Sequence, residues 1–351
     1  EFRSRLSPET QRNLANTLAR VACELGFADP SELDVDSTVQ EGNIAYPSDA
    51  NLMAKLAGMG TKVLSYLKEK TRGLIPDSLN IDLKAIRSKA REYWFTPRNK
   101  DREFKNSIFQ ELHHLVKQEM RPIVDLCESL DPARLKRMPW NIRRTVEQIN
   151  SYGWRYLLDV AHFVRKGKIK AGKILSFHAH EVACISKGKA HKMHEFGRVI
   201  QLGRIKGNFL FVLECMDIQM PDKTVFPTFI EEHAKIFGQD MINSIATDKG
   251  YYSSKNRKSA KAAKIKEIGI QQPANCKNKT GADQLALQEV LRDRRAGIEP
   301  LIGHAKHGGQ LGRSRMKSDS ATKAAAYGSV LSLNLRQMIR YQAGKVKTKA
   351  A

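Results

Sequence analysis

Strand-like segments on both sides of a long helical block constrain the fold of this 351-residue chain more than any other feature. Between residues 50 and 165 apolar residues such as Leu52 and Leu56 recur at the spacing of one helix face. After residue 170, β-branched and aromatic runs punctuated by glycine indicate strands. A shorter strand-like run at 31–50 precedes the helical block. The simplest assembly is a mixed α/β domain that is interrupted by an all-helical insertion.

This reading predicts the domain boundaries. We expect an N-terminal helical segment at 1–30, an α/β domain at 31–50 and 170–340, a helical insertion with a basic linker at 51–169, and a basic tail at 341–351. The chain does not begin with Met, so we expect its start to be incomplete or processed. No apolar run reaches the roughly 18 residues that a membrane span needs. A membrane partner is therefore not predicted.

The charge of the chain points to its partners. Lys and Arg number 60 against 37 Asp and Glu, a formal net charge of +23. Polyanions are the natural partners of such a chain, nucleic acid first and an anionic membrane surface second. Its five cysteines are scattered without a CxxC pair, which favours neither a zinc site nor a disulfide framework. Reduced thiols in a cytoplasmic protein agree better with this pattern.

Three carboxylates occupy positions that suit a metal site. Asp36 lies in a strand-like run, Asp248 ends an apolar strand before a glycine turn, and Glu299 lies in a helical, cationic stretch. In α/β folds such positions converge on one edge of the sheet. Three carboxylates would repel each other there unless a divalent cation held them. Mg²⁺ takes one or two carboxylates per ion, so three suffice for a two-ion site in phosphoryl transfer on DNA.

Each carboxylate also has a purely structural interpretation. Asp36, like its neighbour Asp34, could be a turn residue at the end of a strand. Asp248 before a Lys-Gly pair is typical of an Asx turn. Glu299 could pair with Arg295 one helical turn earlier. For each residue taken alone, the structural alternative is the stronger interpretation. For the three carboxylates taken together, in basic surroundings, the structural alternatives are weaker.

Four stretches carry a resemblance to a known family. They are DSTVQEGNIAYPSD at 36–49, ATDKGYYSSKN at 246–256, RAGIEPLIGHAKHGGQLGRSRMKS at 295–318 and, more loosely, KGKAHKMHEFGR at 187–198. In these stretches the chain resembles the DDE transposases of bacterial insertion sequences, over roughly residues 30–340. The resemblance implies an RNase H-like fold, a mixed sheet with flanking helices, interrupted here by the helical insertion. It also implies that Asp36, Asp248 and Glu299 are the catalytic residues and the ligands of two Mg²⁺ or Mn²⁺ ions.

The last carboxylate belongs to an Arg-x3-Glu-x6-Lys arrangement formed by Arg295, Glu299 and Lys306. Offsets of 4 and 7 place these residues on one face of a helix. Arginine would then hold phosphate oxygens by paired hydrogen bonds and lysine as a point charge. Pro300 disfavours helical geometry at Glu299, so we expect the helix to kink or to restart there. Arg292 stands where related transposases often have Tyr.

The expected DNA contacts are mostly to phosphate. They are Arg295, Lys306, Arg313, Arg315, Lys317, Lys187 and Lys189. The helical insertion and the basic run at 253–266 are further candidates, although a solvated charged helix face explains any single lysine there equally well. The tryptophans interleaved with basic residues, Trp94, Trp140 and Trp154, are expected to anchor a helical core, with base stacking as the alternative.

The resemblance implies a transposase that binds double-stranded DNA at the terminal inverted repeats of its element. Such an enzyme cleaves at the element ends in the presence of metal and joins the freed 3′-hydroxyl to target DNA. Two ends must meet, so we expect a homodimer or a larger assembly, in the cytoplasm of a bacterium at its nucleoid. The alternative is a catalytically inactive or truncated DNA-binding relic of a transposase. A basic RNA-binding protein would leave the carboxylates unexplained, and the chain has no RRM-like or KH-like signature.

Overall fold

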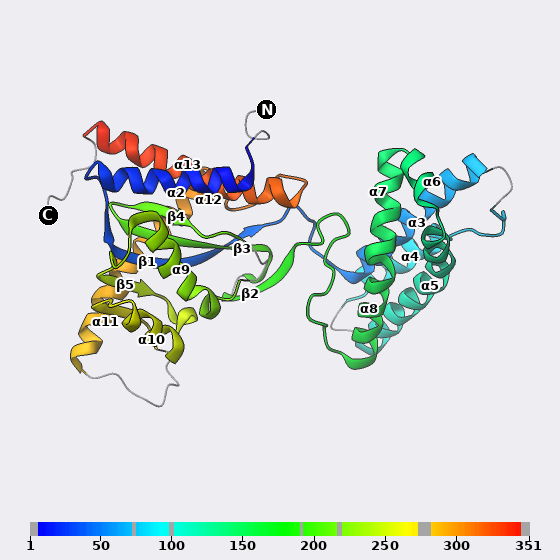
Figure 1. Ribbon diagram of the computed structural model, residues 1–351. Helices are drawn as coiled ribbons and strands as arrows, with labels where there is room; N and C mark the ends of the chain where they lie inside the picture. Colours follow the sequence, from blue (N-terminus) through cyan, green and yellow to red (C-terminus); the bar gives the residue numbers. More distant parts are fainter. Residues whose placement is uncertain are drawn as a thin grey trace. The chain divides into compact units, whose positions relative to one another are not determined.

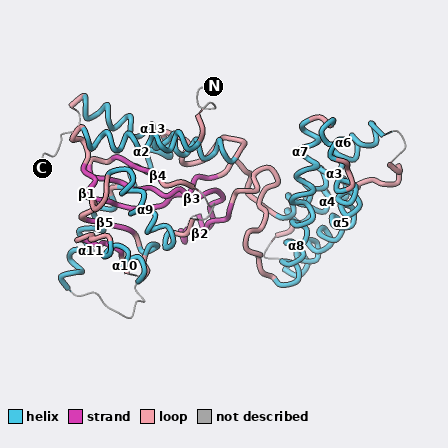
Figure 2. Tube along the Cα trace, in the orientation of Figure 1, coloured by secondary structure: helices cyan, strands magenta, loops and turns pink. Residues whose placement is uncertain are grey.

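The structure, a computed structural model, describes residues 6–71, 75–97, 102–189, 192–215, 220–272 and 282–344. The chain divides into two compact units (Figure 1). One consists of Glu1–Asn43 and Glu181–Ala351, and the other consists of Ile44–His180. All the described strands belong to the first unit, whereas the second unit is helical (Figure 2).

A six-stranded sheet forms the centre of the first unit. Its strands are β1 (Asp29–Glu41), β2 (Ala183–Lys189), β3 (Lys192–Lys206), β4 (Phe209–Val212), β5 (Ser244–Thr247) and β6 (Glu267–Ile270). The order across the sheet is β2–β3–β1–β5–β6, and β4 pairs with β3. β3 is antiparallel to β1, β2 and β4, whereas β1, β5 and β6 run parallel to one another. The sheet is therefore mixed and open.

Helices pack against the sheet. They are α2 (Pro8–Glu24), α9 (Asp222–Phe237), α10 (Ser254–Ala262), α11 (Ala282–Ala296), α12 (Ile298–His307) and α13 (Asp319–Gln342), with a short 3₁₀ turn, η2 (Lys249–Tyr251). Alternation along the strands separates two apolar clusters, because successive side chains point to opposite faces. Leu33 and Val35 of β1 pack in one cluster with Phe226 of α9. Leu202 of β3 packs in the other with Ile298 of α12.

Two asparagines close the free edge of β4. The side chain of Asn16 on α2 donates to O of Val212 at 3.2 Å and accepts from its N at 2.9 Å. Asn334 on α13 makes the same pair of bonds to Leu210, at 2.7 and 3.0 Å. Exposed strand edges invite further strand pairing. The two amides therefore satisfy the backbone of β4 and fix α2 and α13 beside it.

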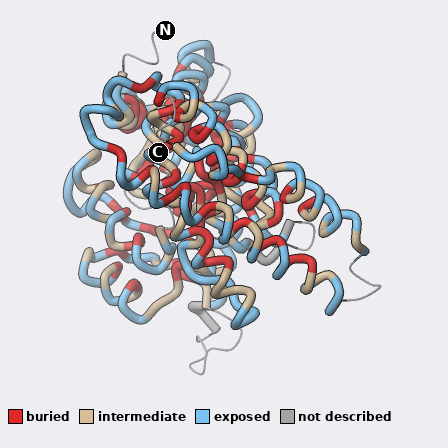
Figure 3. The backbone as a smooth tube through the Cα atoms, turned by 90° about the vertical axis from the view of Figure 1, so that its right-hand side faces the viewer, coloured by how far each residue is buried: buried red, intermediate tan, exposed pale blue. Residues whose placement is uncertain are grey.

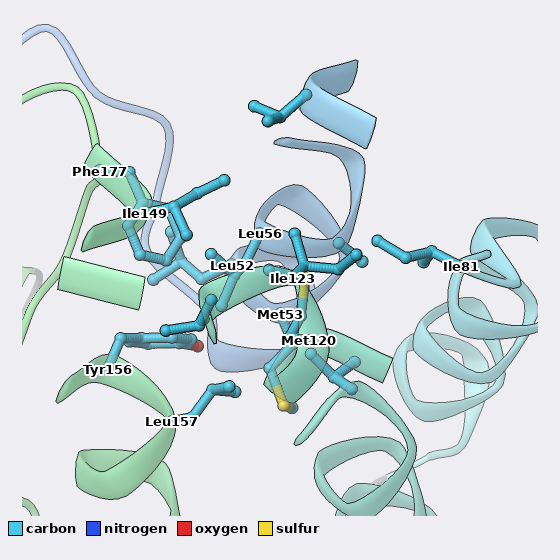
Figure 4. Close-up of a cluster of buried hydrophobic side chains, with 14 of the residues drawn as sticks. Leu52, Met53, Leu56, Ile81, Met120, Ile123, Ile149, Tyr156, Leu157 and Phe177 are labelled. Carbon is cyan, nitrogen blue, oxygen red and sulfur yellow. The ribbon is translucent and has the colours of Figure 1, made fainter. Parts of the chain in front are cut away.

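The second unit has its own core. Its helices are α3 (Asp49–Thr71), α4 (Leu83–Phe95), α5 (Arg102–Glu128), α6 (Pro132–Arg137), α7 (Trp140–Gln148) and α8 (Trp154–Lys166), with a π-helical segment, η1 (Ile149–Gly153), between the last two. Met53, Leu56, Met120 and Tyr156 are fully buried in this core (Figure 4). Buried and exposed residues alternate along the helices, as expected of amphipathic segments (Figure 3).

The structure confirms the predicted mixed α/β class and differs from the sequence analysis in detail. The units divide after Asn43 and after His180, and the N-terminal helix α2 packs within the sheet unit instead of forming a segment of its own. Helix α13 was not predicted. The predicted tail at 341–351 lies outside the described residues after position 344. None of the described helices combines the length and apolar character needed to span a lipid bilayer.

Candidate functional site: an acidic edge with arginine partners

The register of two neighbouring parallel strands brings Asp36 and Asp248 together. Val35 on β1 pairs with Thr247 on β5. Asp36 follows Val35 within β1, and Asp248 follows Thr247, the last residue of β5. Neighbouring strands lie about 4.8 Å apart. β5 ends at Thr247, and Oδ1 of Asp248 accepts a hydrogen bond from N of Gly250 at 2.8 Å, which is the predicted Asx turn. Asp36 lies well inside β1, so its interpretation as a strand-end turn residue is wrong.

Arg295 joins Asp36 to Glu299. Its Nη1 lies 2.9 Å from Oδ2 of Asp36, and its Nη2 lies 3.4 Å from Oε1 of Glu299. Asp36 and Arg295 are largely buried, at 15% and 14% side-chain exposure, whereas Glu299 is 63% exposed. The ion pair predicted as the structural alternative for Glu299 is therefore present, and the same guanidinium also holds Asp36.

The helix breaks between Arg295 and Glu299. Helix α11 ends at Ala296 and α12 begins at Ile298, so Pro300 occupies the first turn of a new helix, where proline is tolerated. The predicted restart is confirmed. It places Arg295 and Glu299 on different helices, and the single continuous helix face that the spacing suggested is wrong.

Asp34 is held by two arginines. It is 2% exposed and accepts hydrogen bonds from Nε of Arg204 at 2.8 Å and from Nε of Arg294 at 2.9 Å. Arg204 also donates to O of Arg294 at 2.7 Å. The interpretation of Asp34 as a strand-end turn residue is wrong, because it lies inside β1 and anchors α11. The Asp-x-Asp and Arg-Arg pairs were visible in the sequence, but their pairing was not.

The pKa of a buried tyrosine, Tyr251, is raised by three carboxylates at this edge. Tyr251 is fully buried, and burial raises its pKa well above the ordinary value. The negative charges of Asp222, Asp36 and Asp248 raise the pKa further, in that order. Asp222, the first residue of α9, was not identified from the sequence. The acidic edge therefore comprises Asp36, Asp222 and Asp248, with Glu299 linked to it through Arg295.

Carboxylate oxygens are ligands that Mg²⁺ prefers, which makes the arrangement of these residues the point to examine. Among the described residues, no three His, Cys, Asp or Glu side chains are arranged to hold a metal ion. Instead, the guanidinium of Arg295 supplies the positive charge between Asp36 and Glu299. Its buried Nε has no hydrogen-bond partner in the part of the chain that the structure describes. Arg295 therefore has one N–H group that is not used within the described residues.

Four of the predicted DNA-binding residues lie near the end of α12 and in the loop that follows it. Lys306 is half-buried near the end of α12, and Arg313, Arg315 and Lys317 are exposed. The loop is joined to the end of β1: N of Glu41 donates to O of Gly312 at 2.9 Å, and N of Ser314 donates to O of Glu41 at 2.8 Å. Lys187 and Lys189 belong to β2, but their side chains lie outside the described part of the structure.

A second basic surface lies in the helical unit. Around the turn between α6 and α7, Trp140 is 63% exposed and stacks on Arg144 at 5.2 Å. We call this surface the α6–α7 corner; its other cations are Arg134, Lys136 and Arg137, all exposed or half-buried. The prediction that the tryptophans anchor a core is wrong for Trp140 and for Trp94, which is 50% exposed. It is confirmed for Trp154, which packs against the core beneath Lys117 and Arg121.

No family model, no curated protein and no solved structure matches the chain.

Proposed function

We propose that this chain is a DDE transposase, which cleaves DNA at the ends of a mobile element and joins them to target DNA. The observation that carries this proposal is the linkage of three carboxylates. Asp36 and Asp248 follow a register pair of parallel strands, and one guanidinium connects Asp36 to Glu299. These are the three carboxylates that the resemblance selects from the 37 acidic residues of the chain.

The fold supports the same proposal. A mixed open sheet with helices on it agrees with the RNase H-like core that the resemblance implies. Asp248 stands at the carboxyl end of β5, the end at which active sites of α/β folds are built. The helical unit leaves the sheet unit after β1 and returns before β2, so that the insertion does not separate β1 from β5.

Asp36, Asp248 and Glu299 would hold Mg²⁺ or Mn²⁺, two ions in the two-metal scheme. Such ions activate the attacking oxygen and stabilise the leaving oxygen of a phosphoryl transfer. Arg295 would leave Asp36 and Glu299 when a stronger cation binds them, and its guanidinium would then bind a phosphate oxygen. Lys306, near the end of the helix that carries Glu299, would add a point charge for phosphate.

The surplus of cations supports a DNA partner. Arg313, Arg315 and Lys317 are exposed in the loop that is joined to β1, and the α6–α7 corner adds a second surface. Phosphate contacts of this kind weaken steeply with salt. Because two element ends must be joined in one event, we propose a homodimer or larger assembly on DNA, in the bacterial cytoplasm at the nucleoid.

The test is cleavage and strand transfer of a labelled element-end duplex in Mg²⁺ and in EDTA, with wild type, Glu299→Gln and Glu289→Gln. Glu289 is a matched control, because it is exposed on α11, one helix earlier. Metal-dependent joining that Glu299→Gln abolishes and Glu289→Gln retains would establish the function. Cleavage without joining would indicate a nuclease instead.

The second candidate is a catalytically inactive relic that still binds DNA. The observation in its favour is that Arg295 already neutralises Asp36 and Glu299. A relic predicts salt-sensitive binding of the same duplex, with neither cleavage nor joining, and with no change in Glu299→Gln.

A further inference from the structure

Asp222 brings a fourth carboxylate to the acidic edge. Its Oδ1 accepts a hydrogen bond from Nε2 of Gln201 at 2.9 Å. Gln201 is 1% exposed, and its Oε1 accepts from the hydroxyl of Tyr251 at 2.6 Å. A partly buried chain of hydrogen bonds therefore connects Asp222 to Tyr251, three residues after Asp248.

The other oxygen of Asp222 faces the turn that follows Asp248. A Cβ on Gly250 would lie 2.9 Å from Oδ2 of Asp222 and 3.0 Å from Oδ1 of Asp248. Real Cβ atoms almost never come within 2.9 Å of another atom, and 3.0 Å is tighter than nine in ten real Cβ contacts. The two carboxylates therefore enclose Gly250, and a side chain at that position would displace one of them.

The network reaches three strands of the sheet. Tyr251, just after β5, also hydrogen-bonds to Ser37 of β1. Ser37 is the register partner of Gln201 on β3 and the residue that follows Asp36. Nε2 of Gln201 donates in addition to O of Met220 at 3.1 Å. Gln201 and Tyr251 are buried, whereas Asp222 and Ser37 are half-buried. Removing the Asp222 carboxylate would leave Gln201, which is buried, with one hydrogen-bond partner fewer.

We propose that Asp222 is a positioning residue, which orients the turn at Gly250 so that Asp248 points into the reaction site. This inference rests on the proposed function, since the reaction needs Asp248. Oδ1 of Asp222 anchors Gln201 and Tyr251 behind the turn, and Oδ2 limits the turn at Gly250. A displacement of about 1 Å at a reacting group can reduce a rate about 100-fold.

Three variants test this role: Asp222→Ala, Asp222→Asn and Asp240→Asn. Asn at 222 keeps an acceptor for Gln201, whereas Ala removes it. Asp240 is the control, because it pairs with Lys264 in the turn that precedes β5, at the other end of the strand from Asp248. Amide hydrogen exchange of the segment 244–256 reports the turn directly. Strand-transfer turnover and the dissociation constant for the element-end duplex report its consequence.

We expect Asp222→Ala to speed exchange in 244–256 at least tenfold and to lower strand-transfer turnover about 10- to 100-fold, with DNA affinity within twofold of wild type. Asp222→Asn should restore slow exchange and most of the turnover, and Asp240→Asn should match wild type. Unchanged exchange in Asp222→Ala would overturn the inference, as would faster exchange with unchanged turnover. If wild type joins no DNA while Asp222→Ala still loosens the turn, the positioning of Asp248 stands and the transposase function fails.

Discussion

Arg294 and Asp34 form a buried ion pair, with Nε of Arg294 2.9 Å from Oδ1 of Asp34. The next residue, Arg295, contacts Asp36, two positions further along β1. Two consecutive arginines thus hold two alternate carboxylates on one face of a strand. This pairing fixes the end of α11 on the sheet, and Glu299 at the start of α12 contacts the same arginine as Asp36.

The first prediction concerns the stability of this anchor. Arg294→Ala should lower the free energy of unfolding by about 1–3 kcal/mol, because Arg204 still neutralises Asp34. Asp34→Ala should cost more, about 3–5 kcal/mol, since it leaves two guanidinium groups without their carboxylate. Urea denaturation followed by circular dichroism measures both values.

Arg292→Ala is the control for this series, because Arg292 is exposed and pairs with its exposed neighbour Asp293; its effect should stay within about 0.5 kcal/mol. All three tryptophans lie in the helical unit, so their fluorescence follows that unit separately. Equal losses in Arg294→Ala and Asp34→Ala would contradict the double pairing of Asp34.

The second prediction separates the two roles of Arg295. Arg295→Met should abolish strand transfer yet increase the affinity for Mn²⁺ about fivefold, because the carboxylates of Asp36 and Glu299 lose an internal competitor worth about 1 kcal/mol. Electron paramagnetic resonance of free Mn²⁺ measures the dissociation constant. An affinity that falls or stays constant would show that Asp36 and Glu299 do not bind the ion.

The third prediction concerns the α6–α7 corner. Replacing Lys136 and Arg137 by Ala should reduce the slope of log binding constant against log salt by about 0.9 for each DNA phosphate that these side chains neutralise in wild type. Filter binding of a labelled duplex at several salt concentrations measures this slope. Lys89→Ala is the control, because Glu92 and Glu111 already neutralise Lys89. If Lys136 and Arg137 can be removed without a change in slope, DNA does not bind at this corner.

The fourth prediction is a pH dependence of stability. Burial lowers the pKa of His233 to about 4, and its Nε2 lies 2.8 Å from O of Pro30, to which it donates. The unfolded chain binds this proton near pH 6.5, so the unfolded state holds more protons between pH 6.5 and 4. Stability should fall as the pH falls through that window, by about 2 kcal/mol between pH 7 and 5 from this group.

His233→Gln keeps a donor for Pro30 but does not titrate in this range. Denaturation curves of wild type and His233→Gln at pH 7 and pH 5 isolate the contribution of the histidine. The variant should lose less stability than wild type on acidification, and equal losses would show that His233 is not held neutral in the folded state.

Local patterns in the sequence predicted the class of the fold and the elements that carry the candidate carboxylates. Helical spacing at 50–165 and glycine-broken apolar runs after 170 separated the two units, because periodicity is a local property. The position of Asp248 after an apolar run, and the helix restart near Pro300, followed from turn and proline stereochemistry. All of these depend on residues only a few positions apart.

Tertiary structure decided how distant residues meet. Arg295 reaches Asp36 across 259 positions, and Gln201 meets Asp222 and Tyr251 through the register of β3 with β1. No local pattern specifies such partners, because strand register and ion pairing depend on which elements pack together. Local patterns therefore predicted the turn at Asp248 and the helix restart beside Glu299, but not the place of Asp36 inside β1. Only the fold placed Arg295 between Asp36 and Glu299. It also placed a further carboxylate, Asp222, next to the turn that follows Asp248.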